Sequence, residues 1–113
     1  MPPAITASTT LCAVIGNPVG HSLSPDIHNA AFRHLGLDWA YAAFRVEDLP
    51  PAIAGVRALG IRGVSITIPH KVAALPLLDS LEETAAKIGA VNTIVNDGGR
   101  LHGINTDGAG ALR

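Results

Sequence analysis

Two serines stand at the start of a predicted helix, where their hydroxyl groups can bind an anion. Ser22 and Ser24 lie in the segment Gly16-Asn-Pro-Val-Gly-His-Ser-Leu-Ser-Pro25. Free backbone N–H groups at the amino end of a helix attract carboxylates and phosphates, and hydroxyls add donors. Ser24 can equally be the helix N-cap, with Ser22 a solvated loop residue. We reject a phosphate-binding P-loop, because the glycine spacing is one residue short and a histidine stands where the phosphate lysine belongs.

A lysine follows a strand that carries further hydroxyl groups. In the segment Ser65-Ile-Thr-Ile-Pro-His-Lys71, alternation places Ser65 and Thr67 on one face of the strand, with Lys71 just beyond its end. A lysine in that place can be partly desolvated and lose its proton easily. An ordinary solvated lysine is the alternative. His70 fits a loop or packing role better than a catalytic one.

An acid and an amide complete the set of candidate residues. Asp107 follows the last predicted strand, and it would meet Lys71 if their strands are neighbours. Such a pair can relay a proton to a substrate oxygen. The alternative role for Asp107 is a helix N-cap. Asn92 begins a strand in an apolar stretch, where a buried amide needs a partner, and either a substrate hydroxyl or a backbone carbonyl would serve.

Two other kinds of site are not expected. The histidines do not stand at metal-ligand spacing, so the sequence indicates no zinc site. The pair Gly108-Ala-Gly110 resembles the start of a dinucleotide fingerprint, but Arg113 occupies the position of the third glycine. We therefore expect no nucleotide site in this chain.

Alternating strand and helix patterns position these residues. Strands are predicted over residues 11–16, 39–46, 63–68, 91–95 and 101–104, with a tight turn at 97–99 that makes the last two a hairpin. Helices are predicted over 25–35, from the cap Asp48 to Gly60, as a short turn over 71–75, and from a Ser80/Glu83 capping box to Gly89.

This order predicts an α/β fold, a three-layer sandwich with a mostly parallel sheet that contains one antiparallel strand from the hairpin. Ligands of open parallel sheets collect beyond the carboxyl ends of the strands. Ser22, Ser24, Lys71, Asn92 and Asp107 fall in loops of that kind, and Ser65 and Thr67 lie on the strand that leads to one of them.

Composition narrows the function classes. The 113 residues carry a net charge of −1, which does not suggest a nucleic-acid or anionic membrane partner. One cysteine excludes an intrachain disulfide, and no apolar run is long enough to cross a bilayer. We expect a cytoplasmic protein with a flexible tail over residues 1–10, no secretory signal, and one domain over 11–104.

The motifs together resemble a known family. Their order and spacing are similar to those of the N-terminal substrate-binding domain of shikimate dehydrogenases. The segments that carry the resemblance are Val14-Ile-Gly-Asn-Pro-Val-Gly-His-Ser-Leu-Ser-Pro-x-x-His-Asn29, Ser65-Ile-Thr-Ile-Pro-His-Lys71, Ile88-Gly-Ala-Val-Asn-Thr93 and Gly103-Ile-Asn-Thr-Asp-Gly108.

The resemblance implies an enzyme of aromatic amino-acid (chorismate) biosynthesis that reduces 3-dehydroshikimate to shikimate with NADPH. It assigns the substrate carboxylate to Ser22 and Ser24, and the catalytic pair to Lys71 and Asp107. By the same resemblance, the ring oxygens would be bound by Thr67, Asn92 and Asp107, with Ser65 beside them. The expected partners are shikimate or 3-dehydroshikimate and, as an option, a second copy in a homodimer.

The chain also departs from the family pattern. Ser65 stands where many members carry Asn, which bears on ring contacts and on shikimate versus quinate preference. The NADP-binding domain of the family is not in this sequence, and residues 105–113 resemble the start of the helix that leads to it. We therefore expect this chain alone to be inactive. The alternatives are a quinate/shikimate dehydrogenase of broader specificity and a stand-alone, non-catalytic module that binds a cyclic polyol carboxylate.

Overall fold

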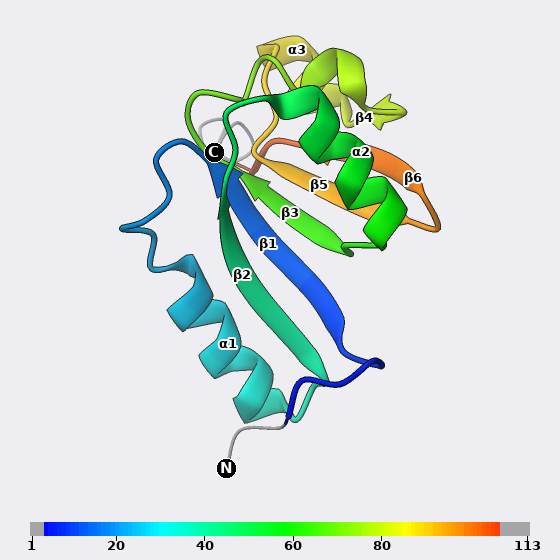
Figure 1. The fold of residues 1–113 in the computed structure, drawn as a ribbon. Coiled ribbons are helices and arrows are strands. Elements are labelled where there is room, and N and C mark those ends of the chain that lie inside the picture. The colour runs from blue at the N-terminus through cyan, green and yellow to red at the C-terminus, as the bar shows by residue number, and fades with distance from the viewer. Residues whose placement is uncertain (1–3, 107–113) are drawn as a thin grey trace.

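A computed structural model describes residues 4–106 of the chain and shows one twisted sheet with helices packed on it (Figure 1). The strands are β1 (Thr10–Gly16), β2 (Trp39–Arg45), β3 (Gly63–Ile66), β4 (Ser80–Leu81), β5 (Thr93–Asp97) and β6 (Arg100–Ile104). The helices are α1 (Ser24–Leu35), α2 (Leu49–Leu59), the 3₁₀ turn η1 (Leu75–Leu77) and α3 (Glu83–Ile88). None of the helices in residues 4–106 is long and apolar enough to span a bilayer.

The sheet runs in the order β2-β1-β3-β5-β6-β4. β1 pairs in parallel with β2 and β3, and β4 pairs in parallel with β6. β5 alone runs the other way, antiparallel to both β3 and β6. Its hairpin with β6 turns at Gly98 and Gly99, whose φ angles of 60° and 95° favour glycine. The predicted α/β sandwich with one antiparallel strand is confirmed.

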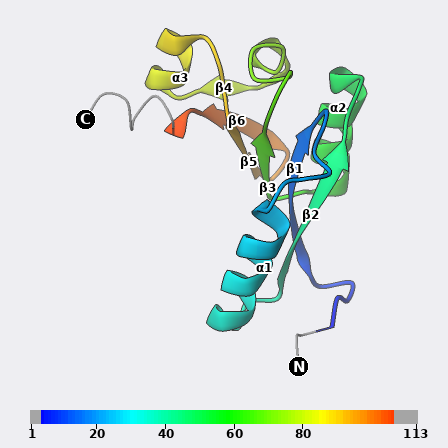
Figure 2. The same ribbon diagram turned by 90° about the vertical axis from the view of Figure 1, so that its left-hand side faces the viewer.

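The pleat of the central strands divides the core into two layers. Ala13 and Ile15 of β1 face the larger apolar cluster, which includes Ile53 and Val56 of α2. Cys12 and Val14 face the opposite side, where α1 packs. Figure 2 shows α1 and α2 on different sides of the long β1–β2 pair. Successive side chains of a strand point to opposite faces, so β1 packs against a helix on each side of the sheet.

Polar and ring contacts help to hold α1 in place, since α1 contains no buried residue and only the half-buried Phe32 packs on the small core cluster. The Asn29 amide donates to the Tyr41 carbonyl at 2.9 Å, and its oxygen accepts from the Tyr41 N–H at 2.8 Å. His28 stacks on the Tyr41 ring at 4.4 Å between centroids. These bonds satisfy outward-facing backbone groups of the edge strand β2, which would otherwise be open to another strand.

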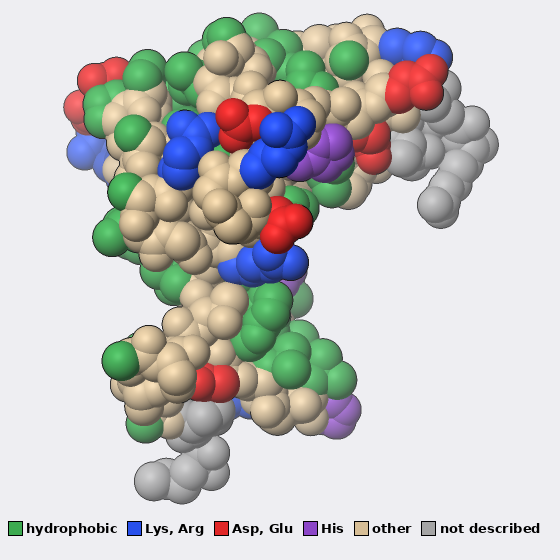
Figure 3. All heavy atoms as spheres, turned by 90° about the vertical axis from the view of Figure 1, so that its right-hand side faces the viewer, with side chains coloured by type: hydrophobic (Ala, Val, Ile, Leu, Met, Phe, Trp, Pro, Cys, Tyr) green, Lys and Arg blue, Asp and Glu red, His purple; other side chains and the backbone are tan. Residues whose placement is uncertain are grey.

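A charged side chain joins α2 to β6. The Asp79 carboxylate accepts from the Leu101 N–H at 2.7 Å and from the Arg57 guanidinium at 3.0 Å. These contacts, the Leu101 bond first, hold the pKa of Asp79 below its usual value. Figure 3 shows basic and acidic side chains beside one another on the face that carries the end of α2 and the β5–β6 turn, so charge there is mixed in sign.

Several predicted boundaries are corrected by tertiary contacts. The Ser80/Glu83 capping box is wrong: Ser80 belongs to β4, where its hydroxyl bonds His102 Nδ1 at 2.8 Å, and α3 begins only at Glu83. Ser24 is the first residue of α1 rather than its N-cap.

The remaining corrections concern the ends of elements. Residues 71–74 form turns, and the helical turn that follows is η1. The strand expected at 91–95 lies two residues later, as β5. Asp48 occupies the N-cap position of α2 but makes no side-chain cap bond. β1 begins at Thr10, before the expected domain boundary, and Ser8 donates to the Asp38 carboxylate at 2.8 Å.

Gly103 provides a test of this packing. A Cβ atom at Gly103 would meet Leu78 Cδ1 at 2.5 Å and Val91 Cγ1 at 2.7 Å. We expect Gly103→Ala to lower the free energy of unfolding by about 1–3 kcal/mol, because the buried neighbours must shift. The measurement is urea denaturation followed by circular dichroism.

The matched control is Gly55→Ala in α2, where a Cβ meets nothing within 4 Å. We expect this control to leave stability unchanged or to raise it by about 0.5–1 kcal/mol, since alanine favours the helix. Equal effects of the two substitutions would contradict the packing described for β6.

Candidate functional site

The predicted site residues come from segments that meet at one end of the sheet. The carboxyl ends of β1 and β3 lie there because the two strands are parallel. β5 runs the other way, so its amino end, with Asn92 and Thr93, reaches the same place. β6 is antiparallel to β5 and therefore brings its carboxyl end, followed by Thr106, to this edge.

These segments enclose a hollow of about 480 Å³. Six of the seven residues predicted for the site line it: Ser22, Ser24, Ser65, Thr67, Lys71 and Asn92. Asp107, the seventh, lies outside the described residues. Thr106, which precedes Asp107, also lines the hollow.

The two serines form the side of the hollow that lies next to α1. The Ser22 N–H donates to the Val19 carbonyl at 3.0 Å, which closes a turn in the loop after β1. The Ser22 hydroxyl accepts from the Ser24 N–H at 3.2 Å. Ser24 then opens α1, with Pro25 next to it. Two hydroxyls therefore stand at the positive end of a helix of twelve residues, where an anionic group is favoured.

Thr67 and Lys71 form the opposite side. The Thr67 N–H donates to the Ile15 carbonyl at 3.0 Å, so the backbone continues to pair with β1 beyond the end of β3. The Thr67 methyl group packs so closely on Gly16 that a Cβ there would overlap it. Lys71 is half-buried, and its carbonyl accepts from the Val91 N–H at 2.9 Å. This backbone bond fixes the place of Lys71 at the hollow, which it lines.

The Asn92 side chain forms hydrogen bonds with two threonines, which its sequence position did not predict. Its amide donates to the Thr106 hydroxyl at 2.8 Å, and its oxygen accepts from the Thr93 hydroxyl at 3.0 Å and from the Thr106 N–H at 3.2 Å. The side chain of Asn92 thus bonds threonines in place of the backbone carbonyl considered from sequence, and a substrate hydroxyl as a further partner stays a prediction. The bonds orient the Asn92 amide and attach the segment after β6 to the start of β5.

The structure adds Tyr41 to the residues around the site. Tyr41 lies on β2, outside every sequence motif used above, and its hydroxyl donates to the Ser65 hydroxyl at 2.8 Å. Burial raises the pKa of Tyr41, and the contact between Tyr41 and Ser65 opposes that rise only in part. A lone tyrosine in an alanine-rich strand was the available signal, but the contact depends on pairing across two strands.

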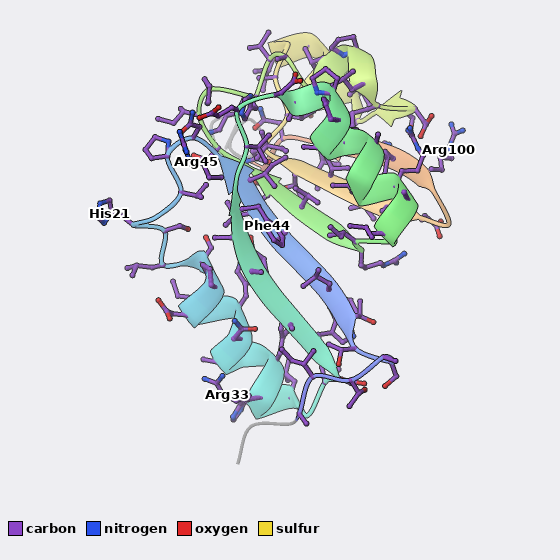
Figure 4. All side chains as sticks on the ribbon, in the orientation of Figure 1. His21, Arg33, Phe44, Arg45 and Arg100 are labelled. Atoms are coloured by element: carbon purple, nitrogen blue, oxygen red, sulfur yellow. The ribbon has the colours of Figure 1, made fainter. Side chains whose placement is uncertain are left out.

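His21 also lines the hollow, and Arg45 lies close to the loop that carries it (Figure 4). His21 projects outward from the loop between β1 and α1, and Arg45 lies at the carboxyl end of β2 (Figure 4). Arg45 Nε donates to the Asn17 side chain at 3.2 Å, and its guanidinium pairs with Glu47. Arg33 and Arg100 lie far from this loop.

His70 has a structural position, in line with the sequence interpretation. It is 6% exposed, and its Nε2 lies 2.6 Å from the Val46 carbonyl, which can only accept. His70 therefore donates from Nε2 and ties the loop after β3 to the end of β2. Within residues 4–106, no three acidic, histidine or cysteine side chains are grouped to hold a metal ion.

The chemistry available in the hollow is that of a small polar ligand. Hydroxyls at a helix amino end favour a carboxylate, while Thr67 and the Asn92 region supply groups that bond to ligand hydroxyls. Lys71 adds a cation that can stabilise negative charge on an oxygen.

The sequence profile of the shikimate dehydrogenase substrate-binding domain matches residues 14–94. A shikimate dehydrogenase (NADP(+)) of Methanothermobacter thermautotrophicus is 54% identical over 111 residues, which cover 96% of this chain and 39% of the relative. The Bacillus subtilis enzyme of the same name is 53% identical over 105 residues, or 91% of this chain and 38% of the relative. The chain thus spans less than half the length of the curated relatives it matches.

Solved structures of enzymes with different names share this fold. A shikimate 5-dehydrogenase from Listeria monocytogenes, in complex with shikimate and NAD, superposes on the whole of this chain and 40% of its own, with a TM-score of 0.92 and 45% identity. A 5-ketofructose reductase of Gluconobacter is 35% identical over 95% of this chain and 39% of its own, with a TM-score of 0.89. The profile match covers most of the chain, which therefore belongs to the shikimate dehydrogenase substrate-binding domain family.

Proposed function

We propose that this chain is the substrate-binding part of an NADP-dependent shikimate dehydrogenase, which reduces 3-dehydroshikimate to shikimate in aromatic amino-acid biosynthesis. The observation that carries the proposal is the meeting of Ser22, Ser24, Thr67, Lys71 and Asn92 around one hollow. The family membership supports the same assignment. The 5-ketofructose reductase is 35% identical to this chain and the Listeria shikimate 5-dehydrogenase 45% identical, so we favour shikimate over 5-ketofructose as the ligand.

Substrate binding rests on matching polar groups. The substrate carboxylate would lie at Ser22 and Ser24, where the hydroxyls and the amino end of α1 favour negative charge. Thr67 and Asn92 would bond the ring oxygens, with Asp107 as a further partner. A site built to hydrogen-bond several hydroxyls discriminates strongly against analogues that lack one, because its own polar groups are then left unpaired.

The chemical role falls to Lys71 and Asp107. When a ketone is reduced, negative charge develops on its oxygen, and an adjacent ammonium stabilises that charge and supplies the proton. A carboxylate beside the lysine would hold the ammonium in place. In the reverse direction the same pair would accept the hydroxyl proton.

The residues present do not fit an NADP site. The 113 residues contain no full glycine-rich dinucleotide fingerprint, since Arg113 stands at the position of its third glycine. The described loops around the hollow carry hydroxyls suited to a small ring. We propose that NADP is bound by protein outside this chain. No step of the chemistry above depends on a cofactor contact from these residues.

Apolar side chains around the hollow support a covering domain. Leu23, Ile68 and Val72 are 67%, 61% and 64% exposed, and each adjoins a residue that lines the hollow. Exposed apolar groups gathered in this way are typical of an interface. We propose that the cofactor-binding part of the enzyme covers them.

A cytoplasmic location and a homodimer stay predictions, and nucleic acid and membranes are not proposed partners.

The catalytic role of Lys71 is tested by Lys71→Ala in the complete product of the gene. We expect kcat for NADPH-dependent reduction of 3-dehydroshikimate to fall about 10²–10⁴-fold with little change in KM, because a proton donor in the transition state is lost.

Lys87→Ala is the matched control, since Lys87 is exposed and pairs at 3.0 Å with Glu83 on α3. It should retain the activity of the unsubstituted enzyme. Full kcat in the Lys71→Ala enzyme would contradict the assigned role, and absence of this reduction by the unsubstituted gene product would contradict the proposed function.

The placement of Thr67 is tested at Gly16. Gly16→Ala would displace the Thr67 side chain, and we expect it to weaken shikimate binding about tenfold, the equivalent of one or two hydrogen bonds. The measurement is an NMR titration of the chain with shikimate. Gly20→Ala lies in the same loop, has open space around its Cβ and should bind as the unsubstituted chain does. Equal binding by both variants would show that Thr67 does not contact the ligand.

A further inference from the structure

Tyr41 is a buried phenol that lies behind the proposed ligand site. It is 7% exposed and belongs to the small core cluster with Cys12 and Val14 on the side of the sheet that α1 covers. Its backbone is held by Asn29 and its ring by the stacked His28. The ring therefore has a fixed position relative to the hollow.

The Tyr41 hydroxyl joins two residues that line the hollow from different elements. It donates to the Ser65 hydroxyl of β3 at 2.8 Å. Ser24 of α1 lies near enough to the phenol to oppose in part the rise in its pKa. Both Ser65 and Ser24 line the hollow, so this buried group on β2 lies next to two elements of the site.

The direction of the Tyr41 bond has a consequence for Ser65. A serine hydroxyl has one proton, and an oxygen that accepts from the phenol directs its own proton elsewhere. Ser65 lines the hollow, so that proton is available to a ligand there. Burial raises the pKa of Tyr41, which keeps the phenol protonated and able to donate at neutral pH.

We propose that Tyr41 is a positioning residue that presents Ser65 to the hollow as a hydrogen-bond donor for an acceptor oxygen of the ligand, such as a carboxylate, ketone or hydroxyl oxygen. The inference rests on the proposed function for the identity of the ligand. The bond from Tyr41 would make Ser65 a hydrogen-bond donor toward the ligand. An asparagine at this position would offer the ligand both a donor and an acceptor.

The experiment is a double-mutant cycle on the chain, with shikimate as the probe and the dissociation constant measured by NMR titration. We expect Tyr41→Phe to weaken binding about five- to tenfold, because Ser65 loses the bond that directs its proton. In a Ser65→Ala background, Tyr41→Phe should change the dissociation constant less than about twofold. A loss of packing alone would weaken binding equally in both backgrounds.

Phe32→Leu is the control for packing, since the Phe32 ring packs against the same cluster and lies near the rings of His28 and Trp39. It should lower the thermal midpoint without changing the dissociation constant. Equal loss in the two Tyr41→Phe backgrounds, or no loss in either, would overturn the inference while leaving the proposed function intact. Failure of the complete gene product to bind shikimate would instead overturn the proposed function.

Discussion

Three backbone hydrogen bonds just beyond the strand ends hold the candidate site together. The Thr67 N–H donates to the Ile15 carbonyl at 3.0 Å, the Ile66 N–H to the Asn92 carbonyl at 2.8 Å, and the Asn92 N–H to the Ile104 carbonyl at 3.0 Å. They continue the pairing of β1, β3, β5 and β6 into the loops. The antiparallel direction of β5 makes this possible, because it places the start of one strand beside the ends of the others. The proposed ligand contacts of Thr67 and Asn92 depend on that arrangement.

The pleat of β3 links the core to the site. Val64 and Ile66 are 1% and 3% exposed in the larger apolar cluster, while Ser65 and Thr67 point to the other side and line the hollow. A slip of one residue in the β1–β3 register would bury the hydroxyls and expose the apolar groups. Burial of Val64 and Ile66 therefore stabilises the sheet and also keeps the hydroxyls of Ser65 and Thr67 on the face of the hollow.

Much of this could be predicted from sequence, and the failures have physical causes. The alternation in β3 and the glycine turn at Gly98 are local signals, so the strand that leads to Lys71 and the β5–β6 hairpin were correctly expected. Ser80 was misplaced because its pairing with β6 joins residues far apart in the chain, and a local capping pattern carries no trace of it. Tyr41 was missed because its side chain reaches across β1 to Ser65 on β3. The roles of the site residues stay predictions.

A crystal structure of the complete gene product with shikimate tests the central claim most directly. The account predicts the ligand in the hollow, with its carboxylate bonded to Ser22 and Ser24 and a ring oxygen within hydrogen-bond distance of Lys71 Nζ. A ligand bound elsewhere, or a ring that leaves Lys71 out of reach, would contradict it.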